Sequence, residues 1–125
     1  MSADWVALSR SAGLSVDGDT IRSDLHNERH QLVHVGEDHG DLLRVWSIVA
    51  RPAIVDGLDD VALRAWRRNR LSELVGFRLD VRRRLIGEAW VPTAGVTADE
   101  WAFTVRYVAK ICDGFEYTLT GRDVE

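Results

Sequence analysis

Histidine, the residue most often used both for binding transition metals and for moving protons, is concentrated in one stretch of this chain. All four histidines lie there: His26, His30, His34 and His39. On a β-strand the first three would share one face, but successive members would lie ~13 Å apart at ~3.3 Å per residue. Since one strand cannot bring them to a common ion, we expect exposed strand and turn histidines and predict no metal site.

The other groups that could carry catalysis each have a structural explanation. Cys112, the only cysteine, falls on an apolar stripe, where a thiol behaves as a small hydrophobic residue. Neighbouring carboxylates occur in a predicted turn and at two predicted helix starts, where negative charge is favoured: Glu37-Asp38, Asp59-Asp60 and Asp99-Glu100. No glycine-rich phosphate loop is present. We therefore predict no enzyme and no cofactor, and a small metal-dependent or hydrolytic enzyme is the least favoured alternative.

Arginines cluster in two parts of the sequence. A patch could form from a predicted helix end and a predicted hairpin tip, and its members are Arg64, Arg67, Arg68, Arg70 and Arg82 to Arg84. The whole chain, however, has 16 basic and 20 acidic residues and a net charge of −4, which disfavours general affinity for nucleic acid. We interpret the patch as charge that complements a helix end plus a solvated tip, and contact with a phosphate or an acidic partner is the alternative.

Length and composition indicate one globular domain over residues 1–125, with 46% hydrophobic and 29% charged residues. A single cysteine excludes an intrachain disulfide and fits a reducing, cytoplasmic setting. We find no basic region followed by an apolar stretch at the N-terminus, and no apolar segment near the ~20 residues of a membrane helix. The sequence thus predicts neither export nor contact with a membrane.

Hydrophobic periodicity and turn residues predict eight elements in the order α-β-β-β-α-β-β-α. They are a helix over 2–12, strands over 18–25, 29–35 and 41–51, a helix from 57, strands over 76–81 and 85–91, and a helix from 97. Asp59 and Asp60 would lie in the first turn of the second helix, and Pro52 would end the strand before it. Thr97 and Glu100 form a capping box at the start of the last helix. The predicted fold class is α+β, a mostly antiparallel sheet packed against helices.

The strand over 41–51 carries large apolar residues on both faces, with Val45 and Val49 on one face and Trp46 and Ile48 on the other. Two apolar faces imply that both are covered. Either the helices cover one face and leave the other to a partner or a second copy, or the first helix wraps round to the far side. The sequence leaves both arrangements open.

This order of elements resembles the fold shared by type III secretion chaperones and YbjN-like proteins. Three segments have a residue pattern similar to that of YbjN-type sequences: the helix Val61 to Leu71, the strand Gly76 to Leu79, and the terminal helix from Glu100-Trp101 to Cys112-Asp113. The resemblance implies a homodimeric, chaperone-like protein-binding module that holds a segment of an unidentified partner protein. A YbjN-type regulator acting through a protein or a small ligand is the alternative.

The same resemblance implies where such contacts would lie. The dimer contact would use the middle helix and its surroundings, here Leu58, Val61, Ala65 and Trp66. The partner contact would use the first helix and the first three strands, here Trp5, Leu8, Val33, Val35 and Trp46.

Overall fold

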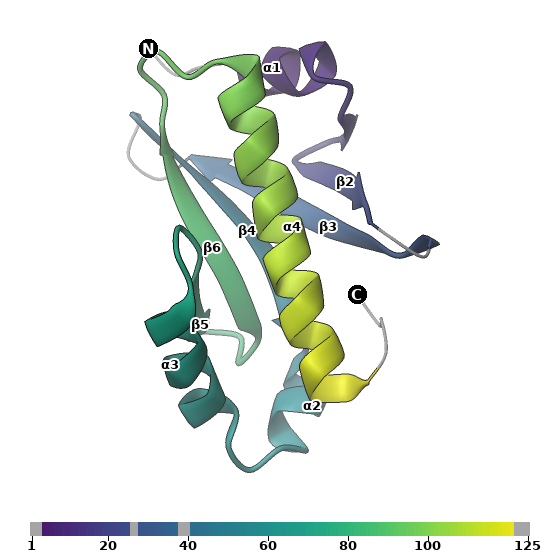
Figure 1. Cartoon of the computed structure of the whole chain (residues 1–125), viewed down its shortest axis with the longest axis vertical. Coiled ribbons are helices and arrows are strands. Elements are labelled where there is room, and N and C mark those ends of the chain that lie inside the picture. The colour runs from purple at the N-terminus through teal and green to yellow at the C-terminus, as the bar shows by residue number, and fades with distance from the viewer. Residues whose placement is uncertain (1–3, 26–27, 38–40, 122–125) are drawn as a thin grey trace.

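A computed structural model describes residues 4–25, 28–37 and 41–121 of the chain (Figure 1). The helices are α1 (Trp5–Ser11), α2 (Pro52–Asp56), α3 (Val61–Leu71) and α4 (Ala98–Thr120). The strands are β1 (Ser15–Asp17), β2 (Thr20–Asp24), β3 (His30–Glu37), β4 (Leu42–Ala50), β5 (Gly76–Leu79) and β6 (Leu85–Pro92). No helix among the described residues is long and apolar enough to cross a membrane. The histidines at positions 26 and 39 lie outside the described residues.

The strands form one antiparallel sheet in the order β1-β2-β3-β4-β6-β5, which confirms the predicted α+β class. The structure adds two short elements to the predicted order. Gly18, at φ +64°, lies in the turn that separates β1 from β2, so the predicted first strand is a hairpin. Pro52 ends β4 as expected and at once begins α2, since its fixed φ suits a first helical position.

α4 lies across the sheet and closes the core (Figure 1). Its buried side chains are Trp101, Ala102, Val105, Val108, Ala109, Cys112, Asp113, Phe115 and Glu116. They cover the face of the sheet that carries Ile21, Val33, Val45 and Ala89. The single continuous face predicted for this helix is thus confirmed, and its last member, Leu119, packs at the edge of the core.

The predicted capping box fixes where α4 begins. The Glu100 amide donates to Thr97 Oγ1 over 3.1 Å, and the Thr97 amide donates to Glu100 Oε1 over 3.0 Å. Gly114 leaves the helix unbroken, and the helix ends at Gly121, which takes the left-handed conformation at φ 74°.

The second predicted helix begins later than the sequence indicated. Gly57 caps the end of α2, and α3 starts only at Val61, so Asp59 and Asp60 precede the first turn instead of lying within it. Asn69, which interrupts the apolar stripe of α3, donates from Nδ2 to the Phe77 carbonyl over 2.9 Å and accepts the Phe77 amide over 2.7 Å. A polar residue is needed there because it bonds α3 to the backbone of β5.

All four helices lie on one side of the sheet, which settles the question left open by the two apolar faces of β4. α1 packs on α4, where Trp5 and Trp101 lie 6.3 Å apart between ring centroids. The Trp101 indole also donates to Ser9 Oγ over 2.7 Å. The first helix therefore does not wrap round the sheet, and no helix of the described residues covers its second face.

Candidate functional site

The uncovered side of the sheet, which we call the open face, is built by alternate residues of the strands. The six that matter most are Leu32, His34, Arg44, Trp46, Glu88 and Trp90, which adjoin one another in the strand register. Leu32 is 43% exposed and Trp90 38% exposed. The open face thus presents both apolar and charged groups to the surroundings.

Trp46 lies at the centre of the open face among cationic and aromatic groups. Its ring stacks on His34, with 4.3 Å between centroids and 21° between planes. The guanidinium groups of Arg44 and Arg84 lie 5.0 and 5.1 Å from its centroid, within the range of cation–π attraction. Burial lowers the pKa of His34, and nearby Arg84 lowers it further against the opposing effect of Asp19. The net effect favours the neutral form of the stacked imidazole.

Ion pairs hold the arginines of the open face in place. Glu88 forms an ion pair with Arg44 over 2.7 Å and another with Arg78 over 2.8 Å. Burial raises the pKa of Glu88, but the hydrogen bonds from the two arginines lower it more. Ile48 and Ile86 are also buried on this face, opposite each other in the register of β4 and β6.

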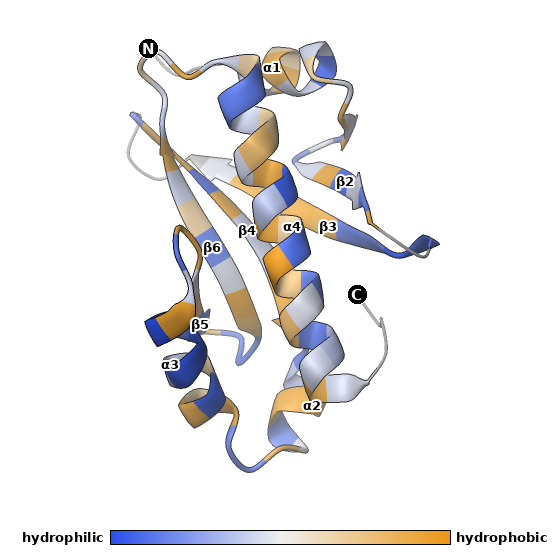
Figure 2. Ribbon diagram, viewed as in Figure 1, coloured by the Kyte–Doolittle hydropathy of each residue, from blue (hydrophilic) through white to orange (hydrophobic). Residues whose placement is uncertain are grey.

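A second candidate surface is the outer α3 face, formed by Leu63, Trp66, Arg67 and Arg70. Spacings of three and four residues place them on one side of the helix, opposite the buried Val61. Along α3 the ribbon changes between strongly hydrophilic and hydrophobic residues (Figure 2). Trp66 is 56% exposed, and the Arg70 guanidinium lies 5.1 Å from its ring centroid. Arg67 and Arg70 have no carboxylate partner among the described residues. This face is therefore apolar at its centre and positively charged toward the helix end.

The residues predicted for a dimer contact fall on both sides of α3. Val61 and Ala65 are buried against the sheet and Leu58 packs on the core, so these three are structural residues in the monomer. Only Trp66 is exposed. The apolar stripe predicted from the sequence combined two faces of α3, because Ala62 and Trp66 adjoin the buried residues. Periodicity did not reveal the separate exposed row from Leu63 to Arg70.

The residues predicted for a partner contact are not brought together. Val33 and Val35 are buried on the helix-covered face, so they offer no surface to a partner while α4 is in place. Trp5 and Leu8 pack partly buried beside α4, whereas Trp46 lies on the opposite side of the sheet. Of the strand candidates, Trp46 alone faces outward, because strand alternation gives the parity of a face but not the face that a helix will cover.

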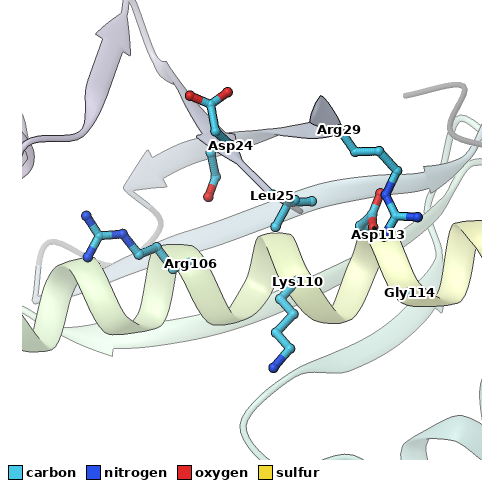
Figure 3. Close-up of a pocket in the computed structure, with 8 residues that line it drawn as sticks. Asp24, Leu25, Arg29, Arg106, Lys110, Asp113 and Gly114 are labelled. Atoms are coloured by element: carbon cyan, nitrogen blue, oxygen red, sulfur yellow. Dashed lines mark ion pairs between the residues drawn. The ribbon is translucent and has the colours of Figure 1, made fainter. Parts of the chain in front are cut away.

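A cavity of about 550 Å³ lies between α4 and the ends of β2 and β3 (Figure 3). Asp24 and Leu25 line its strand side, and Arg106, Lys110 and Gly114 line it from successive turns of α4. At one end Arg29 meets the buried Asp113 over 2.9 Å. The sequence patterns did not indicate this cavity, because its lining comes from segments that only the fold brings together.

The remaining groups with possible chemistry stay apart. Among the described residues, no three His, Cys, Asp or Glu side chains gather into a metal-binding group. Cys112 is fully buried, and burial raises the pKa of its thiol far above the ordinary value. Its surroundings are those of a core residue, as the sequence predicted.

Comparison with protein families gives one match that spans most of the chain. The sequence profile of YbjN, described as "Putative bacterial sensory transduction regulator", matches residues 12–120. No curated protein shows significant similarity to the chain.

Solved structures with the same fold include three that are matched over nearly their whole length. YbjN from E. coli has a TM-score of 0.63 at 15% identity, with 93% of this chain and 88% of that chain covered. The Yersinia pestis type III secretion chaperone SycH, solved with a fragment of YscM2, has a TM-score of 0.57 at 11% identity, covering 93% and 96%. An uncharacterised protein from Methanothermobacter thermautotrophicus has a TM-score of 0.56 at 12% identity, covering 94% and 95%. At these identities the likeness is one of fold.

Proposed function

The chain belongs to the YbjN family, and we propose that it is a non-enzymatic, chaperone-like homodimer that holds a segment of a partner protein. The observation that carries the proposal is the open face. A sheet with helices on one side only, whose other side displays Leu32, Trp46 and Trp90, has a surface suited to a second polypeptide. The SycH structure, a chaperone with a bound protein fragment on the same fold, supports this use of the architecture.

The open face fits a polypeptide segment better than a purely apolar ligand. Trp46 offers an aromatic surface, and its arginine neighbours offer hydrogen-bond donors to carbonyl and carboxylate oxygens. Tryptophan and arginine are the residues most enriched in the energetic centres of protein interfaces. Trp5 and Leu8, on the other side of the sheet, would form a separate contact for a segment that passes round the domain.

Capture experiments with a matched pair of variants test partner binding. Leu32→Asp places a charge on the open face, while Val81→Asp places the same charge at a residue that is 98% exposed on the β5–β6 hairpin. We expect a protein held by the unmodified chain to be lost from Leu32→Asp and kept by Val81→Asp, as measured by affinity capture and quantitative mass spectrometry. Equal capture by both variants, with both folded by circular dichroism, contradicts the proposal.

For the homodimer we propose antiparallel contact of two outer α3 faces. Asp60 lies just before the helix and Arg70 near its end, about 15 Å apart along the axis. Neither has an ion-pair partner among the described residues of its own chain. Suppose that two copies of α3 meet antiparallel through their outer faces, with the two-fold axis at the level of Ala65 along the helix. Each Asp60 then faces the other copy's Arg70, and Leu63 and Trp66 lie between the two charged ends. The charges of the helix then complement each other across the two-fold axis.

A charge swap tests this dimer. Arg70→Asp and Asp60→Arg should each raise the dimer dissociation constant by about tenfold, since each variant loses two exposed ion pairs and gains two repulsions. The double variant restores complementarity and should bind nearly as tightly as the unmodified chain. Sedimentation equilibrium measures this against a monomer mass of 14.1 kDa. A monomeric unmodified chain, or a double variant weaker than either single one, refutes the arrangement.

One observation favours a second function, that of a regulator which responds to a small ligand. The cavity beside α4 has a volume within the range of small-molecule sites, about 300 to 1,000 Å³, and it is lined by segments that are far apart in the sequence. A ligand there would contact α4, which covers the sheet. Ligand-dependent binding of a partner protein would distinguish this function from constitutive binding.

A further inference from the structure

The cavity between α4 and β2 has the dimensions of a ligand site. Its 550 Å³ extends along α4 from Arg106 to Gly114, about 12 Å at the rise of a helix. It exists because α4 crosses the central strands and leaves the outer strand β2 with few helix contacts (Figure 1). The space is therefore a product of the fold.

The charges around this cavity do not balance. Its two carboxylates are matched, since Asp113 pairs with Arg29 over 2.9 Å and Asp24 pairs with Arg22 over 3.1 Å. Arg106 and Lys110, one turn apart on α4, have no carboxylate partner among the described residues. Like charges at this spacing disfavour a helix. The cavity is a positive region in a chain whose net charge is −4.

Arg29 is held as a fixed cation at the end of the cavity. Asp113 binds its guanidinium through Nη2, and the guanidinium carbon Cζ lies 5.4 Å from the ring centroid of Tyr117. The side chain still keeps 32% of its surface exposed. A guanidinium that is already oriented loses little freedom when it binds an anion.

Gly114 lines the same cavity in the middle of a helix, where glycine is the least favourable residue apart from proline. Packing does not require it, because a Cβ at this position would meet nothing within 4 Å. Because Gly114 has no side chain, the helix backbone at this position is exposed to a ligand in the cavity.

We propose that this cavity binds a small organic anion with an apolar body. The anionic group lies beside Arg29, in the positive field of Lys110 one turn before Asp113 on α4, and the apolar body packs on Leu25 and the bare backbone at Gly114. The inference rests on the second candidate function, whose cavity it assigns to a ligand class, and its failure leaves the protein-binding function untouched.

A pair of probes matched in shape but not in charge tests the proposal on the full chain. 4-Phenylbutyrate and 4-phenylbutanol have the same apolar body and differ in charge, and amide chemical shifts in ¹H–¹⁵N spectra report where each one binds. We expect the carboxylate to shift the amides of Leu25, Lys110 and Gly114, and to bind about tenfold more tightly than the alcohol.

Three variants complete the experiment. Lys110→Glu should weaken binding of 4-phenylbutyrate by about tenfold, whereas Arg82→Glu, the same charge change on the exposed hairpin tip, should leave it unchanged. Gly114→Leu should fill the cavity and abolish the shifts, and its open surroundings let the chain fold normally. The proposal is overturned if acid and alcohol bind equally, if the shifts lie away from the cavity, or if Gly114→Leu binds like the unmodified chain.

Discussion

Gly87, on the helix-covered face of β6, gives the sharpest test of how α4 packs on the sheet. A Cβ at this position would overlap the Cys112 sulfur and lie 2.9 Å from Phe77 Cε1. Both neighbours are buried, and Phe77 is itself held edge-on against Phe115 with 4.9 Å between centroids. Neither can move aside without disturbing the core, so Gly87→Ala must push α4 and β5 away from the strand.

The expected cost follows from these contacts. Overpacking a well-filled core costs about 1 to 3 kcal/mol, and two simultaneous overlaps with buried groups place Gly87→Ala near 3 kcal/mol. For a domain of 125 residues this corresponds to a melting temperature lower by about 10 °C. Gly76→Ala, on the paired strand β5, is the matched control because its Cβ would meet nothing within 4 Å.

A double-mutant cycle with Cys112→Ala shows whether the sulfur is the cause. Removing the sulfur should relieve the larger overlap, so the double variant should be more stable than the sum of the two single effects predicts, by about 1 kcal/mol or more. Urea unfolding followed by circular dichroism gives the four free energies. Additive effects, or a Gly87→Ala variant as stable as Gly76→Ala, would falsify the close approach of α4 to β6.

Four further outcomes follow from individual contacts. Glu88→Gln should cost about 1 to 2 kcal/mol at pH 7, and because the folded pKa lies below its ordinary 4.5, the difference from the unmodified chain should shrink as the pH falls below that value in urea titrations. Asn69→Leu, although it completes an apolar stripe, should lose about 1 to 2 kcal/mol with its two bonds to Phe77, and greater stability would contradict this. Thr97→Ala should lower the unfolding free energy by about 1 kcal/mol. Cys112 should react with a thiol reagent only in denaturant, and rapid labelling of the native chain would contradict its burial.

Local signals in the sequence predicted the β3–β4 and β5–β6 hairpins and the last helix well. The capping box at Thr97 and the regular spacing from Trp101 to Phe115 are strong because they depend only on neighbours in the chain. The start of α3 was predicted four residues too early, because Gly57 and the aspartates that follow resemble a helix start but in fact belong to the end of α2 and the link after it.

Features that depend on distant parts of the chain could not be predicted. β4 has large side chains on both faces, so alternation could not show that α4 would cover Val45 and leave Trp46 outward. Burial of Val33 and Val35 likewise depends on which face of the sheet α4 covers. The cavity near Lys110 requires α4, β2 and β3 to meet, and the charge complementarity of α3 appears only once Val61 is known to face inward.

The position of α4 in the chain has a consequence for synthesis of the protein. All six strands are translated before the helix that shields their apolar side, and the 23 residues of α4 need about 1 to 5 s at the usual rate of elongation. During that interval the nascent sheet is apolar on its unprotected side, with Val33 and Val45 uncovered. The strands can reach their native packing only after translation of α4, so the nascent chain has to avoid aggregation until then.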